Sequence, residues 1–325
     1  SSGLNAAILR TVGEDPLITE ICIRSSALLR RPPESFSTTS LVDPCGLLLV
    51  ANSERAQELH DWVRAAGSHV QAEPITIDRF RQLAPHFAGE IASAFYFPHE
   101  GRLDIAALCQ GFSRFPPGAV EVRTTTSVRE LARQRNRIVG VRLDDGEQIL
   151  ASTTVLAAGG WAGQLGAAVG SRVRLRPTRR HLAVTAPDTR VNASWPVVWS
   201  LGDAFYCRPE SRGMLLCACD EESVDPDDCR PSMAVCEAIA EKTTQLLPDY
   251  ADAQVAHLWC GMRTLSEDGR FVVGFDPDLS GLFWVAGLGG HGMVCAFEIG
   301  RLAADVLTNT VTDERLAKAF DPARL

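Results

Sequence analysis

The spacing of apolar residues predicts three helices in the first three quarters of the chain. The first covers residues 54–66 and ends before Gly67, since glycine commonly terminates a helix. Its apolar positions recur at helical intervals: Ala56, Leu59, Trp62, Val63 and Ala66. A short helix capped by Thr76 or Asp78 is predicted to end at Pro85, and a longer one covers residues 231–247.

Other stretches have the patterns of strands. Residues 47–51 are a short apolar run that leaves a turn, and residues 138–143 lead into Asp144-Asp145-Gly146, a typical hairpin signal. The continuous apolar run over residues 153–158 predicts a strand covered on both faces. Between residues 172 and 225, β-rich runs alternate with prolines, which indicates a mainly antiparallel sheet.

The C-terminal part combines two strands, a glycine-rich turn and a helix. The strands are predicted over residues 271–275 and 282–286. The helix is expected to bury one stripe of residues spaced by three and four positions: Met293, Phe297, Gly300, Ala304 and Leu307. The chain therefore mixes helices with both parallel-type and antiparallel-type strands.

The composition of the chain excludes several classes of function. With 325 residues, 46% of them hydrophobic, the chain can bury the cores of two domains. A net charge of -8 provides no basic face for nucleic acid. The ten cysteines contain no Cys-x-x-Cys pair, so we expect buried thiols of a reducing compartment and no metal site. Without a signal peptide or a membrane-spanning stretch, a soluble cytoplasmic protein is expected.

One segment carries a recognisable chemical signal. Residues 282–293 read Leu-Phe-Trp-Val-Ala-Gly-Leu-Gly-Gly-His-Gly-Met, which is a buried strand, a glycine-rich turn and the start of a helix. Glycines let backbone N–H groups approach a ligand closely, and the helix dipole favours negative charge there. Upstream, residues 261–270 read Gly-Met-Arg-Thr-Leu-Ser-Glu-Asp-Gly-Arg and lead into a strand that ends at Gly274.

These motifs resemble the end of FAD-dependent amino-acid and amine oxidoreductases of the D-amino acid oxidase superfamily, the group of glycine oxidases, sarcosine oxidases and D-amino acid dehydrogenases. Further segments resemble the same superfamily. Residues 97–104 are similar to its crossing back to the cofactor domain, residues 155–161 to its Ala-Ala-Gly-x-Trp turn, and residues 1–10 to the segment beside the flavin. The resemblance covers nearly the whole chain.

The resemblance implies an α/β fold, α+β overall, with two interleaved domains. A Rossmann-like FAD-binding domain would comprise residues 1–35, 104–170 and 258–325, incomplete at its N-terminus. A mainly antiparallel substrate domain would comprise residues 36–103 and 171–257. Proteins of the superfamily begin with a strand and a Gly-x-Gly-x-x-Gly turn, which would occupy roughly forty residues ahead of Ser1. Either this sequence omits that segment, or the native protein lacks it.

Several residues would contact the substrate. Arg263 is implied to bind its carboxylate through two parallel hydrogen bonds, and an ion pair with Glu267 or Asp268 is the alternative. Tyr206 is implied as a second contact to that carboxylate. Arg180 and His181 are further substrate candidates, although charged strand residues usually face solvent.

The resemblance also implies a set of cofactor contacts. His291 has a side chain suited to proton transfer, but its loop is implied to place backbone N–H groups near the flavin C2 carbonyl, which favours an electrostatic role. The residues implied to contact FAD are Ser2, Gly3, Asn5, Ala6, Ala7, Val128, Ala158, Gly159, Trp161, Gly261, Gly289, Gly290, His291, Gly292 and Met293.

Two departures from the sarcosine oxidase pattern refine the prediction. The flavin-linking cysteine of those enzymes has Gly261 at its position, and Cys260 is one residue early, which on a strand turns the thiol to the other face and predicts noncovalent FAD. Their oxygen-activating lysine is replaced by Ser223 in Ser-Val-Asp-Pro-Asp, which favours a dehydrogenase over an oxidase.

The implied reaction oxidises the C–N bond of a D-amino acid, glycine or an N-alkyl amino acid by hydride transfer to flavin N5. The electron acceptor stays open between a quinone, a carrier protein and oxygen, as does a homo- or hetero-oligomeric state. A noncatalytic or truncated subunit of this fold, which binds a partner chain without flavin, is the alternative.

Overall fold

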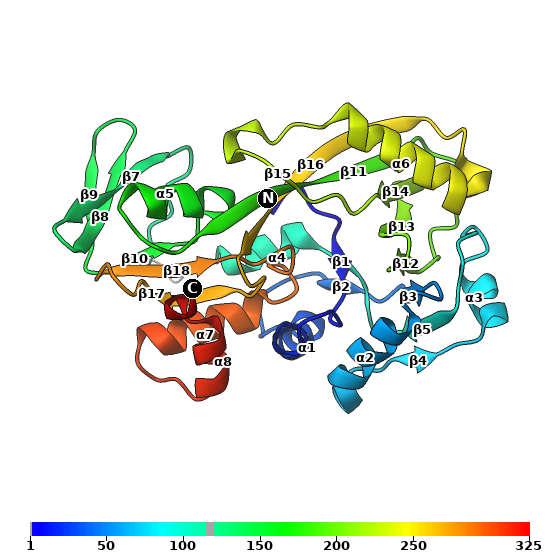
Figure 1. Ribbon diagram of the computed structural model, residues 1–325, viewed down its shortest axis with the longest axis horizontal. Coiled ribbons are helices and arrows are strands. Elements are labelled where there is room, and N and C mark those ends of the chain that lie inside the picture. The colour runs from blue at the N-terminus through cyan, green and yellow to red at the C-terminus, as the bar shows by residue number, and fades with distance from the viewer. Residues whose placement is uncertain (1, 115–119) are drawn as a thin grey trace.

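The computed structural model describes residues 2–114 and 120–325, arranged as helices around four β-sheets (Figure 1). The helices are α1 (Pro16–Arg30), α2 (Ala56–Ala66), α3 (Ile77–Leu83), α4 (Ile105–Phe112), α5 (Ala162–Ala168), α6 (Met233–Leu246), α7 (Ala296–Leu307) and α8 (Glu314–Phe320). The three helices predicted in the first three quarters of the chain thus form within two residues of the expected bounds. No helix in these two ranges is long and apolar enough to cross a bilayer.

The largest sheet is mainly antiparallel, as predicted. Its strand order is β15 (Glu222–Ser223), β11 (Leu175–Thr185), β14 (Gly213–Cys217), β13 (Phe205–Glu210), β12 (Val197–Ser200), β3 (Leu47–Ala51), β5 (Ser93–Phe97) and β4 (Glu73–Pro74), and β16 (Val255–Ser266) also pairs with β11. Only β12 and β3 run parallel. One face packs on α6 through Ala183, Leu216 and Ile239, which leaves the opposite face for the site.

A second sheet combines β10 (Thr154–Leu156), β18 (Leu282–Ala286) and β17 (Val272–Phe275). The β10–β18 pair is parallel and the β17–β18 pair antiparallel. In Figure 1, α1, α7 and α8 lie along one side of this sheet. Phe271 and Phe283 of the sheet pack there against Ile21, Ile299 and Leu302 of the helices, which fixes the glycine-rich turn that follows β18.

Two small sheets complete the fold. The strands β8 (Arg137–Leu143) and β9 (Gln148–Leu150) form the predicted hairpin, and β7 (Val128–Gln134) also pairs antiparallel with β8. The strands β1 (Ile8–Leu9), β6 (Gly101–Leu103) and β2 (Val42–Asp43) form the other. The predicted division into two interleaved domains stays a prediction, and β16 runs unbroken through its boundary at residue 258.

Two expectations about burial are wrong. The buried side of α7 consists of Glu298, Ile299, Leu302 and Ala303, whereas Gly300, Ala304 and Leu307 are exposed. The glycine-rich turn continues to Cys295, and the helix begins only at Ala296. The face that packs on the core is therefore shifted by one to two residues from the predicted stripe. The run 153–158 is also not covered on both faces, because Val155 in β10 is 47% exposed.

Asp276, which follows β17, is a buried anchor of the second sheet. Its Oδ2 accepts hydrogen bonds from Ser171 Oγ and from Trp284 Nε1 at 3.0 Å, and its Oδ1 accepts from the Leu279 backbone N–H at 2.9 Å. Trp284 is fully buried. Each donor would lose its partner if this carboxylate were removed, and an unsatisfied buried donor is costly.

We therefore expect Asp276→Ala to lower the free energy of unfolding by about 2–4 kcal/mol, measured by urea denaturation. The exposed neighbour Asp278, which forms only a surface ion pair with Arg172 at 3.4 Å, provides the matched control. Asp278→Ala should change stability by less than about 0.5 kcal/mol. Equal effects of the two substitutions would contradict this role of Asp276.

Candidate functional site

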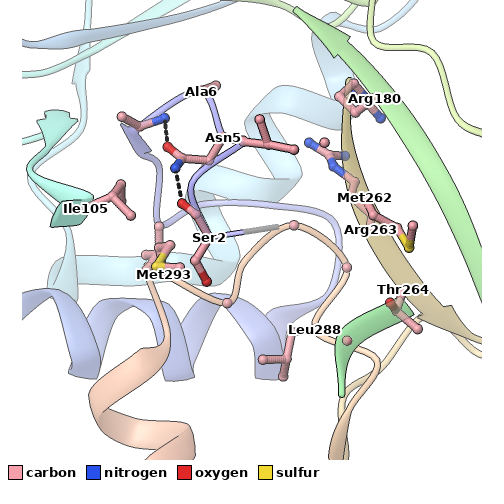
Figure 2. A pocket seen from close by; sticks show the side chains of 18 of the residues that line it. Ser2, Asn5, Ala6, Ile105, Arg180, Met262, Arg263, Thr264, Leu288 and Met293 are labelled. Atoms are coloured by element: carbon pink, nitrogen blue, oxygen red, sulfur yellow. Dashed lines mark hydrogen bonds between the residues drawn. The ribbon is translucent and has the colours of Figure 1, made fainter. Parts of the chain in front are cut away.

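A cavity of about 500 Å³ opens on the free face of the large sheet (Figure 2). Its walls come from five places: the N-terminal segment 2–8, Leu103 and Ile105, the turn at 157–161, the sheet face of β11, β12, β13 and β16, and the glycine-rich turn at 285–294. A cavity of this size suits a cofactor ring or a small organic ligand.

The alternation of side chains along β11 decides which of its charged residues reaches the cavity. β11 pairs antiparallel with β16, with Arg180 opposite Gly261 and His181 opposite Cys260. Successive side chains of a strand point to opposite faces, so Arg180 faces the cavity and His181 faces α6. Of the two substrate candidates, the structure brings only Arg180 into the site.

His181 instead holds the α6 side together. It is completely buried, its Nδ1 lies 2.7 Å from Asp220 Oδ2, and its Nε2 accepts a hydrogen bond from the Ser232 backbone N–H at 2.8 Å. A nitrogen that accepts from an amide carries no proton, so this imidazole is neutral and donates from Nδ1 to Asp220. Both ring nitrogens are thereby occupied by structural partners.

Arg263 projects from β16 into the cavity and contacts the glycine-rich turn. A Cβ atom at Gly290 would lie 2.7 Å from Arg263 Nε, and Gly290 has a φ of +93°, so glycine is required at this contact. The expected alternative partner Asp268 pairs with Arg324 at 2.7 Å instead. Burial, and then the positive charge of Arg180, lower the pKa of Arg263, which indicates a cation held without a compensating carboxylate.

Tyr206 reaches the same cavity from β13. Its side chain is 1% exposed and its ring lies 4.4 Å from the ring of Trp199, at an interplanar angle of 30°. Burial raises the pKa of this phenol, so it stays protonated and can donate a hydrogen bond into the cavity. Tyr206 and Arg263 thus line the cavity together.

The N-terminal segment crosses β16 at Gly261. A Cβ atom at Gly261 would lie 2.1 Å from the Leu4 carbonyl oxygen, so only glycine allows this crossing. The segment is held by the Ala7 N–H donating to Asn5 Oδ1 at 2.7 Å and by Arg208 Nε donating to Ala6 O at 2.9 Å. The predicted contacts Ser2, Asn5, Ala6 and Ala7 line the cavity, and Gly3 does not.

The glycine-rich turn offers unused hydrogen-bond donors. Gly289 donates its N–H to Thr264 O at 3.0 Å, which ties the turn to β16. The N–H groups of Gly290, Gly292 and Met293 have no hydrogen-bond acceptor in the part of the chain that the structure describes, and all three residues line the cavity. Such donors fit an electronegative edge of a bound ring.

Two other predicted contacts lie elsewhere. Val128 is exposed at the start of β7 and lines no part of the cavity. His291 donates its backbone N–H to Leu288 O at 2.8 Å, so this N–H is occupied within the turn. Burial, followed by the charges of Arg10 and Arg263, lowers the pKa of the His291 imidazole to about 3, which keeps it neutral. Its side chain does not line the cavity.

The opposite wall contains Ala158, Gly159 and Trp161 of the predicted turn. Trp161 Nε1 donates to Asp227 Oδ1 at 2.8 Å, which links this turn to the loop that follows β15. Cys260 points away, with its Sγ 3.3 Å from Cys229 Sγ. Among the described lining residues there is no cysteine, histidine or lysine.

Sequence reasoning missed the apolar part of the lining. Most of these residues lie inside the recognised motifs and, apart from the hydroxyl of Thr264, have no polar side-chain group that marks them as contacts: Leu4, Ile8, Leu103, Ala157, Met262, Thr264, Val285, Ala286, Gly287 and Leu288. Ile105, Leu182, Trp199 and Val294 lie outside the motifs. One of them could have been predicted from its spacing. Leu182 is two residues after Arg180 on β11, and strand residues two positions apart lie on the same face.

Comparison with known proteins identifies the family of this chain. The profile of the DAO family, described as "FAD dependent oxidoreductase", matches residues 1–306. The chain is 28% identical to a glycine oxidase of Geobacillus kaustophilus over 326 residues, which cover 95% of this chain and 80% of that protein. The solved L-proline dehydrogenase of P. horikoshii superimposes with a TM-score of 0.83 at 20% identity, covering 100% of this chain and 87% of that one.

Longer relatives match over only part of their length. The chain is 28% identical over 279 residues to an anaerobic glycerol-3-phosphate dehydrogenase subunit A1 of Haloferax volcanii, which covers 79% of this chain. The chain spans 45% of the length of that relative.

The crossing at Gly261 gives a direct test of this geometry. In Gly261→Ala the new methyl group meets a backbone oxygen that no rotamer change can move, so we expect a loss of about 1–3 kcal/mol in unfolding free energy. Gly300→Ala is the control, since nothing lies within 4 Å of its Cβ position in α7. That substitution should stabilise the protein by about 0.5–1 kcal/mol, and a similar loss at both sites would refute the proposed crossing.

The His291 environment predicts a pH dependence. The folded-state pKa of about 3 lies below the ordinary value of 6.5, so the unfolded state takes up a proton first as the pH falls. Stability is therefore lost between those two values, and His291→Gln should reduce the loss. The measurement is urea denaturation of both proteins at a series of pH values in that window. An unchanged pH slope would show that His291 is accessible to protons in the folded state.

Proposed function

Because the chain belongs to the DAO family of FAD-dependent oxidoreductases, we propose that it oxidises the C–N bond of a small amino acid or secondary amine. The observation that supports this most is Arg263, a half-buried guanidinium that faces the cavity without a carboxylate partner among the described residues. A substrate carboxylate supplies the missing charge and matches the two parallel N–H groups of arginine. D-amino acids, glycine and N-alkyl amino acids share this group.

The cavity fits the ring end of FAD bound without a covalent link. The N–H groups of Gly290, Gly292 and Met293, which have no acceptor among the described residues, would face the electronegative edge of the ring, and segment 2–8 would lie on the other side of the ring. When bound, FAD supplies the two-electron acceptor for the hydride that leaves the carbon next to nitrogen. No described lining residue is a cysteine or histidine that could bond to the ring.

The residues of this chain then have positioning roles. Arg263 binds the carboxylate, and the neutral Tyr206 phenol donates a second hydrogen bond to it, which together orient the C–N bond. No aspartate, glutamate, histidine or lysine lies among the described lining residues, so the amine binds in its neutral form and no protein base removes a proton. Water hydrolyses the imine product.

The acceptor that reoxidises the flavin is proposed to be other than oxygen. A lysine near the flavin is the feature that favours oxygen in the sarcosine oxidases, and Ser223 occupies that sequence position in this chain. The absence of a lysine from the described lining supports the same choice. We therefore favour a dehydrogenase that passes electrons to a quinone or a carrier protein.

Flavin bleaching by amino acids tests this function. The full-length protein should show the absorbance bands of FAD, and anaerobic addition of its amino-acid substrate should bleach them. Arg263→Met should keep the flavin spectrum and reduce the rate constant for bleaching at subsaturating substrate by about 100- to 1000-fold, since a charge-assisted bidentate contact is lost.

Arg179→Met is the matched control, because Arg179 lies on the neighbouring strand β11, opposite Met262, and forms an ion pair with Glu222 at 2.6 Å. It should leave the bleaching rate within about twofold. A colourless protein that does not take up FAD would instead favour a noncatalytic, partner-binding subunit. Normal bleaching in the Arg263 variant would remove this residue from the mechanism.

A further inference from the structure

Arg180 and Arg263 share one wall of the cavity. Arg263 is opposite Thr178 and Arg180 is opposite Gly261, so the two arginines are diagonal neighbours on the same face of the β11–β16 pair. Diagonal neighbours are about 7–8 Å apart at the backbone, within reach of two long side chains. In Figure 2 both guanidinium groups lie on the same side of the cavity, one from each strand.

Neither guanidinium has a carboxylate as close as the one that pairs with Arg208, a third arginine of this face. Arg208 is 4% exposed, and its Nη1 lies 2.6 Å from Glu210 Oε2. Arg180 is similarly buried at 7%, but its nearest carboxylate is the exposed Glu221 at 3.7 Å, and its Nε has no hydrogen-bond acceptor within the described residues. The charge of Arg180 also lowers the pKa of Arg263, after burial.

The cavity itself provides no compensating acid. Its described lining includes Arg180 and Arg263 but no aspartate or glutamate. Two cations held together away from water repel each other, and the repulsion is relieved when anions bind between them. A ligand with a single carboxylate would pair with only one of the two guanidinium groups.

We infer that the substrate carries two carboxylates, and that Arg180 binds the second while Arg263 binds the one beside the reacting C–N bond. This inference rests on the proposed function. It narrows the substrate class to acidic amino acids and imino diacids, such as D-aspartate, D-glutamate and iminodiacetate. Arg180 is thereby a specificity-determining residue.

A nearby thiol does not replace the second carboxylate. Burial raises the pKa of Cys217, but the hydrogen bond from Cys219 and the charge of Arg180 outweigh burial and bring the value to about 6. Burial acts to lower the pKa of Arg180, but nearby groups, Cys217 first among them, outweigh burial and raise that pKa, so the thiol partly compensates this cation. Cys217 is also not among the residues that line the cavity, so it does not occupy the space between the arginines.

Equilibrium binding of unreactive acids tests the inference without turnover. Succinate and malonate are titrated into the full-length, FAD-loaded protein, with propionate and acetate as one-carboxylate counterparts. Binding is followed by the change in flavin absorbance and by thermal stabilisation. The dicarboxylates should bind about 10- to 100-fold more tightly, as expected for one additional charge-assisted contact. Equal affinities would overturn the inference.

Variants separate the two arginines. Arg180→Met should weaken succinate binding about 10- to 100-fold and leave propionate binding within about threefold, whereas Arg263→Met should weaken both. Arg180→Lys keeps the charge, so it should retain part of the succinate preference even if the methionine variant folds poorly. Arg179→Met should change neither affinity. Equal weakening of both acids by the Arg180 variants would show that Arg180 acts on the cofactor or the fold instead.

Flavin reduction distinguishes failure of this inference from failure of the proposed function. D-aspartate, D-glutamate and iminodiacetate are compared anaerobically with D-alanine, glycine and sarcosine. Faster bleaching by the first group supports both proposals. Equal bleaching by both groups overturns the two-carboxylate site and leaves C–N oxidation intact. If succinate binds through Arg180 but none of the six compounds bleaches the flavin, the binding site stands and the proposed reaction is refuted for them.

Discussion

The register between β11 and β16 is the constraint on which the site depends. The two strands pair from Leu175 opposite Ser266 to Thr185 opposite Val255, with one irregularity after Val184. Side chains alternate along both strands, so this register directs Arg180, Gly261 and Arg263 to the cavity. A shift of β16 by one residue would bring Cys260 to the cavity instead of Gly261 and turn Arg263 to the other face.

Two close backbone approaches complete the arrangement. The N-terminal segment crosses β16 where Gly261 has no side chain, and the glycine-rich turn packs on the Arg263 guanidinium where Gly290 has none. Positive charge and free N–H donors therefore meet in a cavity that is otherwise largely apolar. This combination binds anions and the electronegative edge of a ring, which is the physical basis for assigning an amino-acid substrate and a flavin to one site.

Most helices and strands near the site, and the glycine-rich motif, could be predicted from the sequence. Periodicity predicted α2, α3, α6, β3 and β18, and the motifs around Arg263 and Gly290 indicated the family. It did not predict which face of α7 is buried, because nine residues of turn after β18 set the phase of that helix. Nor could it choose between Arg180 and His181, since adjacent strand residues are distinguished only by what covers each face. The apolar lining was not identified, even where it lies within the motifs, because the sequence does not show what an aliphatic side chain contacts.

The most direct test of the account is a crystal structure of the full-length protein with FAD and succinate bound. The account predicts the flavin ring in the cavity between segment 2–8 and the glycine-rich turn, with its edge on the N–H groups of Gly290, Gly292 and Met293. One succinate carboxylate should lie on Arg263 and the other on Arg180. A flavin ring bound elsewhere, or succinate away from Arg263, would contradict it.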